Sequence, residues 1–476
     1  MNEIKYKDTS LTINKIGTTD NTISGRGGLA FISRYIENIK FYRLIEKKLA
    51  GYRTSLKGKA ISFILRQILV FFIDGTHKAI SGFDILRKDD GYASLLEVKK
   101  EDLLSSHAIK RFLGKFSYFK CDVLRKILNT LFIWRLCIKQ PDVIILDIDT
   151  MVLNNDDALK RDGVSVTYKN KKGFQPLQIT WGNIIIDAHF RRGSAHSNHG
   201  DDAQKAIKRV VDLIRTHYRG DVPIIVTCDS GFLDEKNLHY FGKGLGVLFI
   251  CFGKLYDSIK NYVCAIPTRD FSDYSNNRQI WHYAEFGSKL KSWEKVGFLR
   301  TIFTTQLCDD NGQMLLEIAR PDSVLYTNIG CNEKLTQQLK SAGHEELVSC
   351  EKIIECAHNR GSNELCNRSL KDFMTSEKLP FKRFGMNAAY YYLMLIAHTL
   401  YESYKEDVVN KAEISPVKAH CYPTTFRRVL FDFAAQIVYS AKRVSLLVMD
   451  GIRNDLKIDL LWELCRIKKR EPIPLL

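Results

Sequence analysis

Apolar residues recur at every third or fourth position through much of the first 140 residues, a spacing that predicts amphipathic helices. The clearest stretches are residues 57–73 and 122–137, which contain no proline. Between them, Ser105 and Ser106 precede a short basic segment, residues 108–115. A serine cap before a basic helix is typical of a helix-turn-helix DNA-binding motif and also of an ordinary surface helix. The pattern predicts a helical N-terminal region and leaves both roles open for the basic segment.

The pattern changes at Pro141, where strand-like segments begin. Residues 143–146 form a wholly apolar run that ends in acid, as a buried central strand would. Residues 201–218 have the spacing of an amphipathic helix. The expected strands are residues 143–146, 165–168, 176–181 continuing through 183–186, 223–227 and 246–251. Strands that alternate with helices in this way predict an α/β core.

From about residue 268 to 348 the period shortens to that of strands. A strong hairpin-turn signal, Asp-Asp-Asn-Gly at 309–312, lies in this segment. The expected strands are residues 299–307, 314–318 and 324–328. Helical spacing resumes near residue 357 and continues, with breaks, to about residue 406. The pattern therefore predicts that residues 268–348 form a small β-rich insertion.

Composition and charge narrow the class of protein. Lys plus Arg exceed Asp plus Glu by 71 − 54, which gives the 476 residues a formal charge of +17 and points to a polyanionic partner. A content of 45% hydrophobic and 11% aromatic residues excludes a disordered chain. Residues 60–73, the most apolar early run, contain Arg66 and are too short to span a bilayer. The first ten residues lack the apolar core of a secretory signal, so we expect no membrane segment and no secretion.

The twelve cysteines form no C-x-x-C pair. Cys350, Cys356 and Cys366 are the closest group, and their gaps do not match a zinc ribbon or finger. We expect reduced, mostly buried thiols in a cytosolic protein. His189, His196 and His199 also suggest zinc, but no fourth ligand stands at a suitable spacing, which favours structural or DNA-proximal roles.

Three acids occur at the ends of predicted buried strands. Asp147 and Asp149 follow the first strand, and Asp229 follows a later one. Ligands gather at strand ends in α/β sheets, and carboxylate oxygens suit Mg²⁺. The sequence therefore predicts a metal or phosphate site at this edge, and leaves open which of the first two acids contributes.

A fourth acid lies between two cations in the spacing R-x3-E-x6-K, formed by Arg360, Glu364 and Lys371. At 3.6 residues per turn, Glu364 lies about 40° and Lys371 about 20° from Arg360 around a helix. All three share one narrow stripe, which is unusual for a packing face. Glu364 would complete a metal site, and the two cations would bind phosphate oxygens.

These motifs resemble those of a known family, the DDE transposases of the insertion-sequence group that includes the IS4 and IS1380 families. The resemblance is closer to the IS1380 family. The matching residues are Asp149-Thr150, the Asp-Ser-Gly-Phe box at 229–232 and the R-x3-E-x6-K signature. Looser matches are residues 192–200, the segment Tyr-Thr-Asn at 326–328, and Gly27-Gly28. The likeness extends from about residue 25 to 440. One departure is Ala357, where the family usually has Tyr, with His358 beside it.

The resemblance implies an α/β fold: an RNase H-like mixed sheet core interrupted by a β-rich insertion, with helical N- and C-terminal regions. The expected parts are a DNA-binding region at 1–140, the first part of the core at 141–267, the insertion at 268–348, the core helix with the catalytic Glu at 349–415, and a C-terminal region at 416–476. An amphipathic stretch at 424–439, with Arg427 and Arg428, gives that last region a possible dimer or DNA contact.

The resemblance also implies a chemistry. Asp149, Asp229 and Glu364 would be catalytic and hold two Mg²⁺ or Mn²⁺ ions for cleavage and strand transfer at a phosphodiester. Arg360 and Lys371 would bind DNA phosphates, and Trp293, or second Trp281, would stack on a flipped base. The partners would be double-stranded DNA at terminal inverted repeats and target sites, bound by a homodimer in a paired-end complex. The setting would be the bacterial cytoplasm, at the nucleoid when bound.

Two other functions stay open. The segment Asp147-Ile-Asp149 resembles the start of haloacid-dehalogenase-type phosphatases, with Asp147 as nucleophile and Asp229 and Asp234 as the later acids. Met151 departs from the phosphatase pattern. A phosphatase function would also give no role to the R-x3-E-x6-K residues on their shared helix face. A catalytically inactive, transposase-derived DNA-binding protein is the other alternative.

Overall fold

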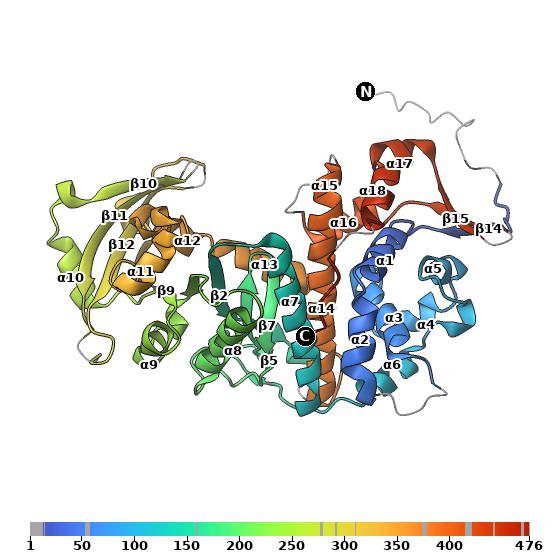
Figure 1. Cartoon of the computed structure of the whole chain (residues 1–476), viewed down its shortest axis with the longest axis horizontal. Coiled ribbons are helices and arrows are strands. Elements are labelled where there is room, and N and C mark those ends of the chain that lie inside the picture. The colour runs from blue at the N-terminus through green and yellow to red at the C-terminus, as the bar shows by residue number, and fades with distance from the viewer. Residues whose placement is uncertain are drawn as a thin grey trace, which may run out of the picture.

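A mixed nine-stranded sheet extends from the middle of the molecule, beside α14, to its left end in Figure 1. The computed structural model describes residues 13, 15–52, 58–158, 160–276, 279–290, 293–309, 311–373, 378–414, 421–440, 443–467 and 471–475, and at 361–364 it describes the backbone alone. In spatial order the strands are β10 (Ser272–Asn276), β11 (Gln279–Ser288), β12 (Leu299–Cys308), β13 (Asp322–Thr327), β9 (Leu248–Phe252), β8 (Ile224–Cys228), β2 (Ile144–Thr150), β6 (Leu177–Trp181) and β7 (Ile184–His189).

Five neighbouring strands of this sheet have the RNase H-like arrangement. β6 is antiparallel to both of its neighbours, β7 and β2, whereas β2, β8 and β9 are parallel. β13 pairs with β9, so β10–β13 extend the same sheet rather than forming a separate one. The predicted mixed sheet of RNase H type is confirmed.

Helices cover both faces of the core strands. Because side chains alternate along a strand, the neighbours Ile225 and Val226 of β8 face opposite clusters. Val226 packs with Val210 of α8, and Ile225 packs with Ile353 of α12 in the other cluster. The helices of this half are α8 (Asp202–His217), α9 (Glu235–His239), α10 (Asp257–Cys264), α11 (Glu333–Ser341), α12 (Cys350–His358) and α13 (Gly361–Lys371).

The N-terminal and C-terminal regions share one apolar core around α14 (Phe384–Tyr404). In Figure 1 this long helix runs between the sheet and the N-terminal helices. Arg427 ties the two regions together, because its guanidinium donates to the carbonyls of Phe72 and Ile73 at 3.0 and 2.7 Å. The other helices are α1 (Leu29–Asn38), α2 (Phe41–Leu49), α3 (Ile61–Asp74), α4 (Gly82–Leu86), α5 (Asp90–Leu95), α6 (Ser106–Leu113), α7 (Asp122–Lys139), α15 (Asn410–Ala412), α16 (Pro423–Leu430), α17 (Asp450–Asp455) and α18 (Ile458–Cys465).

Two small sheets complete the fold. One joins both ends of the chain, since β1 pairs with β14. The other lies next to the end of β2. Their strands are β1 (Thr22–Ser24), β14 (Ala435–Ser440) and β15 (Arg443–Val448), and β3 (Leu153–Asn154), β5 (Lys172–Phe174) and β4 (Ser165–Val166).

Several predicted elements are confirmed. The stretches at 57–73, 122–137 and 201–218 correspond to α3, α7 and α8, although residues 53–57 lie outside the described ones. Most of the basic segment, residues 108–113, lies in α6, and the Ser105 hydroxyl caps this helix by accepting from the Ala108 amide at 3.2 Å. Within the ranges the structure describes, no helix is both long and apolar enough to cross a membrane.

Other predicted elements are wrong. Residues 176–186 form two strands rather than one, because the chain turns at Gly182 with φ 56°. Residues 314–318 are not a strand; β12 makes one bridge to Met314 and pairs with β13 beyond it. Residues 165–166 belong to a small separate sheet. The amphipathic stretch at 424–439 is helix α16 followed by β14, so the C-terminal region is not purely helical.

All twelve cysteines fall within the described residues, and none of them forms a disulfide. Seven are buried, including Cys228 on β8 and Cys251 on β9. This agrees with the expectation of mostly buried thiols.

Candidate active site

Two aspartates lie side by side at the carboxyl ends of parallel strands. β2 and β8 pair with Ile148 opposite Cys228, so Asp149 and Asp229 are the next residues at the same edge. Both line a cavity of about 1060 Å³. The rest of its lining is largely polar and basic, and it includes Thr150, Asn154, Tyr168, Lys169, Lys171, Gln279, Trp281, Gln306, His358, Arg360, Asn367, Arg368 and Lys371.

Asp147 points into the protein rather than into the cavity. It is only 4% exposed, and its Oδ1 accepts hydrogen bonds from the Thr227 hydroxyl, at 2.8 Å, and from Arg360. Burial raises the pKa of Asp147 to about 7, against the lowering effects of Arg360 and Thr227. An acid enclosed in this way holds Arg360 in place and has no access to a substrate.

Asp149 lies closer to the surface, with 24% of its side chain exposed. Its Oδ1 accepts from the Thr150 amide at 2.7 Å and lies 4.0 Å from Nη2 of Arg360. Burial raises the pKa of Asp149, Arg360 opposes that rise, and the negative charge of Asp229 adds to it. Two carboxylates that repel each other at a cavity wall favour a bound cation.

Asp229 begins a short turn, where its Oδ1 accepts from the amide of Gly231 at 2.9 Å. Glycine gives this turn room, because a Cβ at residue 231 would lie in tight contact, 3.0 Å from the Asp229 carboxylate and from the Ser197 hydroxyl. The Asp-Ser-Gly-Phe box therefore fixes the orientation of the acid.

The R-x3-E-x6-K residues come together on one helix, as the spacing predicts. Arg360 stands directly before α13, which contains Glu364 and ends at Lys371. Arg360 and Lys371 both line the cavity. The side chain of Glu364 lies outside the described residues, so only its place on the backbone of α13 is known. Burial opposes the charge of Arg360, but Asp147 and Asp149 beside it raise the pKa of the guanidinium.

The two tryptophans occupy different surroundings. Trp293 is 9% exposed and packs in the cluster with Val324 and Tyr326, and it does not line the cavity. Trp281 lines the cavity, its ring lies 4.2 Å from that of His358, and its indole N–H is buried without a described partner.

Sequence analysis missed the basic hairpin between β4 and β5. Tyr168, Lys169 and Lys171 line the cavity opposite α13, and the charge of Lys169 reaches Asp149. The run Tyr-Lys-Asn-Lys-Lys at 168–172 is the signal that marks this segment.

The donor set fits a divalent cation. Asp149 and Asp229 supply hard oxygen ligands from adjacent strand ends in a polar cavity. Among the residues whose side chains are described, no three of His, Cys, Asp and Glu gather as a complete metal site would require. The third expected ligand is Glu364 of the R-x3-E-x6-K motif, and its side chain falls outside that description.

The histidines do not form the suggested zinc group in the described part of the chain. The rings of His196 and His199 are 5.7 Å apart, whereas His189 bonds the Tyr118 hydroxyl at 2.6 Å. His189 has a structural role, as the sequence favoured.

Residues 6–455 match the family described as Transposase DDE domain group 1. The chain belongs to this family. This DDE transposase therefore has DNA as its partner, and enzymes of the family generally use divalent metal ions. The phosphatase alternative is wrong, since Asp147 is buried and β6 lies antiparallel beside β2.

Other comparisons add little. The cryo-EM structure of the piggyBac transposase synaptic complex with hairpin DNA is similar over 87% of this transposase and 83% of its own chain, at 13% identity and a TM-score of 0.38. That likeness is too distant to bear on the site. No curated protein matches the sequence.

Proposed function

We propose that this transposase moves an insertion sequence by cut-and-paste transposition, with Asp149, Asp229 and Glu364 as catalytic residues and metal ligands. The observation that carries the proposal is the placement of Asp149 and Asp229 at adjacent parallel strand ends, in a basic cavity that α13 also lines. A cavity with two acids among cations suits a phosphodiester and a divalent ion together.

The chain's own residues would bind and orient the DNA. Arg360 is held by Asp147 and reaches within 4.0 Å of Asp149, so it would offer its remaining donors to a phosphate oxygen at the reacting bond. Lys371, at the other end of α13, would neutralise a neighbouring phosphate. Divalent ions, two of Mg²⁺ or Mn²⁺, would supply Lewis acidity toward the attacking and leaving oxygens.

Trp281 is a better candidate than Trp293 for stacking on an extruded base. Trp281 faces the cavity, whereas Trp293 is packed among core side chains. A ring that stacks on a base must present a free face to solvent or ligand. His358, against Trp281, would take part of the space that a Tyr fills elsewhere in the group.

The remaining expectations belong to the same proposal. The IS1380 subtype, a bacterial setting at the nucleoid, and a homodimer in a paired-end complex on inverted repeats and target DNA follow from the sequence motifs. So do a DNA-binding role for residues 1–140, an insertion at 268–348, a core in two parts at 141–267 and 349–415, and a contact surface at 416–476.

Charge-removing variants of the two acids test the function. Asp149→Asn and Asp229→Asn should bind DNA about as wild type does but lose metal-dependent strand cleavage by a factor of about 10³ or more. Asp234→Asn is the matched control, because Asp234 caps α9 from the same loop and asparagine caps equally well. Cleavage that survives in Asp149→Asn and Asp229→Asn would contradict the assignment.

Intact end binding with no cleavage by wild type in Mg²⁺ or Mn²⁺ would favour the inactive DNA-binding alternative. Equal loss of binding and cleavage in Asp229→Asn would make that residue structural. The two readouts, binding and cleavage, are therefore measured on the same DNA.

A further inference from the structure

A second cavity, of about 780 Å³, opens at the carboxyl end of β7, two strands from β2. Four segments enclose it: the chain after α6, the loop before β4, the chain from the end of β7 to the start of α8, and the start of α14. Its lining contains two more cations than carboxylates, and these charged residues are Lys115, Arg191, Arg192, Arg383, Asp162 and Asp202. The cavity is therefore suited to an anion.

Arg191 forms the buried part of the lining and is only 4% exposed. Its Nε donates to the carbonyl of Gln175 at 3.0 Å, and its Nη1 donates to Asp202 at 3.2 Å. Its Nη2 is buried with no hydrogen-bond partner among the described residues. A buried charged donor without a partner is unfavourable, and Arg191 is the most deeply buried of the four cations that an anion in the cavity would approach.

Two exposed arginines stand at the mouth of the cavity. Arg192 lies over the ring of Phe384 at 5.4 Å and pairs with Asp162 at 3.1 Å. Arg383 donates to the carbonyl of Gly114. Neither arginine uses all five of its donors in these contacts, so both keep donors for an anion.

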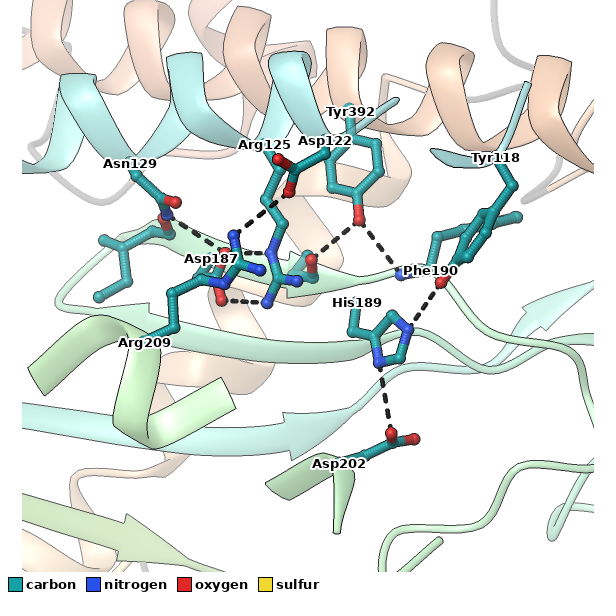
Figure 2. Close-up of polar contacts among 12 residues, drawn as sticks. Tyr118, Asp122, Arg125, Asn129, Asp187, His189, Phe190, Asp202, Arg209 and Tyr392 are labelled. Atoms are coloured by element: carbon teal, nitrogen blue, oxygen red, sulfur yellow. Dashed lines mark hydrogen bonds and ion pairs between the residues drawn. The ribbon is translucent and has the colours of Figure 1, made fainter. Parts of the chain in front are cut away.

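The floor of the cavity is held by a polar network (Figure 2). His189 lies between the Tyr118 hydroxyl, at 2.6 Å, and Asp202, at 3.6 Å. The hydroxyl of Tyr392 donates to the carbonyl of Ala188 at 2.9 Å and fixes the end of β7 on α14. The cations are thus presented from a fixed frame rather than from a free loop.

The cavity is connected to the active site by the sheet and by one loop. Thr150 of β2 pairs with Leu177, and Leu177 pairs with His189, so the three lie in one row across the edge. Two strand spacings are about 10 Å, which is at most about three nucleotides of one DNA strand, because the rise of about 3.4 Å per nucleotide is measured along the axis around which the backbone winds. The loop after β7 also touches the active site, because the Ser197 hydroxyl lies 3.3 Å from that of Thr150.

We propose that this cavity binds a backbone phosphate of the DNA, within about three nucleotides of the reacting phosphodiester. Arg191 contacts the phosphate from below, and Arg192 and Arg383 close over it from the rim. The inference rests on the proposed function for its distance to the cut, but the binding of a DNA phosphate does not depend on cleavage.

A pair of substitutions at Ser194 tests whether the cavity binds a phosphate. This exposed residue lines the cavity and takes no part in the active site. Ser194→Glu and Ser194→Gln differ in charge at nearly equal size. On a duplex oligonucleotide in EDTA, Ser194→Glu should weaken binding about tenfold relative to Ser194→Gln, and Ser194→Gln should bind as wild type does. Equal affinities for the two variants would overturn the proposal.

The salt dependence supplies a second test. Arg192→Gln/Arg383→Gln should reduce the slope of log K against log salt by about 0.9, which corresponds to the loss of the one phosphate contact. Arg219→Gln is the matched control, because Arg219 is also ion-paired and stands near Asp142, at the opposite end of β2. An unchanged slope in the double variant, or the same change in Arg219→Gln, would contradict the proposal.

Inorganic phosphate and modified DNA separate the remaining outcomes. Binding of inorganic phosphate that Ser194→Glu abolishes, with unchanged DNA affinity, would assign the cavity to a free anion and overturn the proposal. Neutral methylphosphonates placed about one to three nucleotides from the cut should remove the Ser194→Glu effect at one position. If wild type does not cleave but Ser194→Glu still weakens duplex binding, the cavity assignment stands and the proposed catalysis fails.

Discussion

Replacing Asp187 with asparagine leaves the guanidinium of Arg125 buried without its counter-charge (Figure 2). Asp187 is fully buried on β7, and the Arg125 side chain on α7 is 12% exposed. The Asp187 carboxylate accepts from Nε of Arg125 at 2.6 Å, from its Nη2, and from the Asn129 amide at 3.2 Å. Asp187→Asn keeps the shape but removes the charge and part of the accepting capacity.

Breaking a buried ion pair costs about 3–5 kcal/mol. Because one amide oxygen still accepts, we expect about 3 kcal/mol for Asp187→Asn, a factor of about 100 in the unfolding equilibrium. Urea unfolding followed by circular dichroism measures the loss. Asp212→Asn is the control, since Asp212 forms an exposed pair with Lys208 on α8 and should cost less than 1 kcal/mol.

A double variant, Arg125→Leu/Asp187→Leu, separates the pair from the packing. It should recover much of the lost free energy of unfolding, because apolar side chains can replace a buried ion pair at little cost. If Asp187→Asn were no less stable than Asp212→Asn, the network in Figure 2 would not hold β7 against α7.

The remaining predictions concern pH, packing and cleavage. Burial lowers the pKa of His398 to about 3, so between pH 6.5 and pH 3 the unfolded chain binds a proton that the folded chain does not. The free energy of unfolding should therefore fall with decreasing pH by up to roughly 1 kcal/mol per pH unit. His398→Gln should flatten that pH dependence in unfolding curves. Trp293→Ala should cost about 3 kcal/mol or more of stability. Trp281→Ala should cost less stability and should instead reduce the yield of DNA cleavage. A larger loss of stability in Trp281→Ala than in Trp293→Ala would contradict the placement of the two rings. Lys371→Ala should weaken end cleavage more than non-specific DNA binding, and wild-type cleavage by that variant would refute the stripe on α13.

Local pattern predicted the elements whose apolar residues are mostly buried. The run before Asp147 is a central strand, and the strand expected at 223–227 corresponds to β8 (Ile224–Cys228), which is buried on both faces. The pattern failed where apolar residues are not buried, as at Leu316 and Ile318, which are 77% and 96% exposed. It also could not show the turn at Gly182, because apolar residues continue on both sides of it.

The site was predictable in part. Spacing alone placed Arg360, Glu364 and Lys371 on one helix. It could not choose between Asp147 and Asp149, because residues two apart point to the same side of a strand and only depth in the sheet separates them. The basic cavity beside β7 was not predictable, since residues near 115, 191 and 383 meet only in the folded chain.

Cleavage of a DNA fragment that carries this gene's own flanking sequence tests the central claim most directly. Wild type and Glu364→Gln are compared in Mg²⁺ and Mn²⁺, and both are checked for binding to the same fragment. We predict cuts at discrete inverted-repeat ends by wild type, and binding without cuts by Glu364→Gln. Metal-dependent cuts of equal yield by both proteins would contradict catalysis by the two strand-end aspartates together with Glu364.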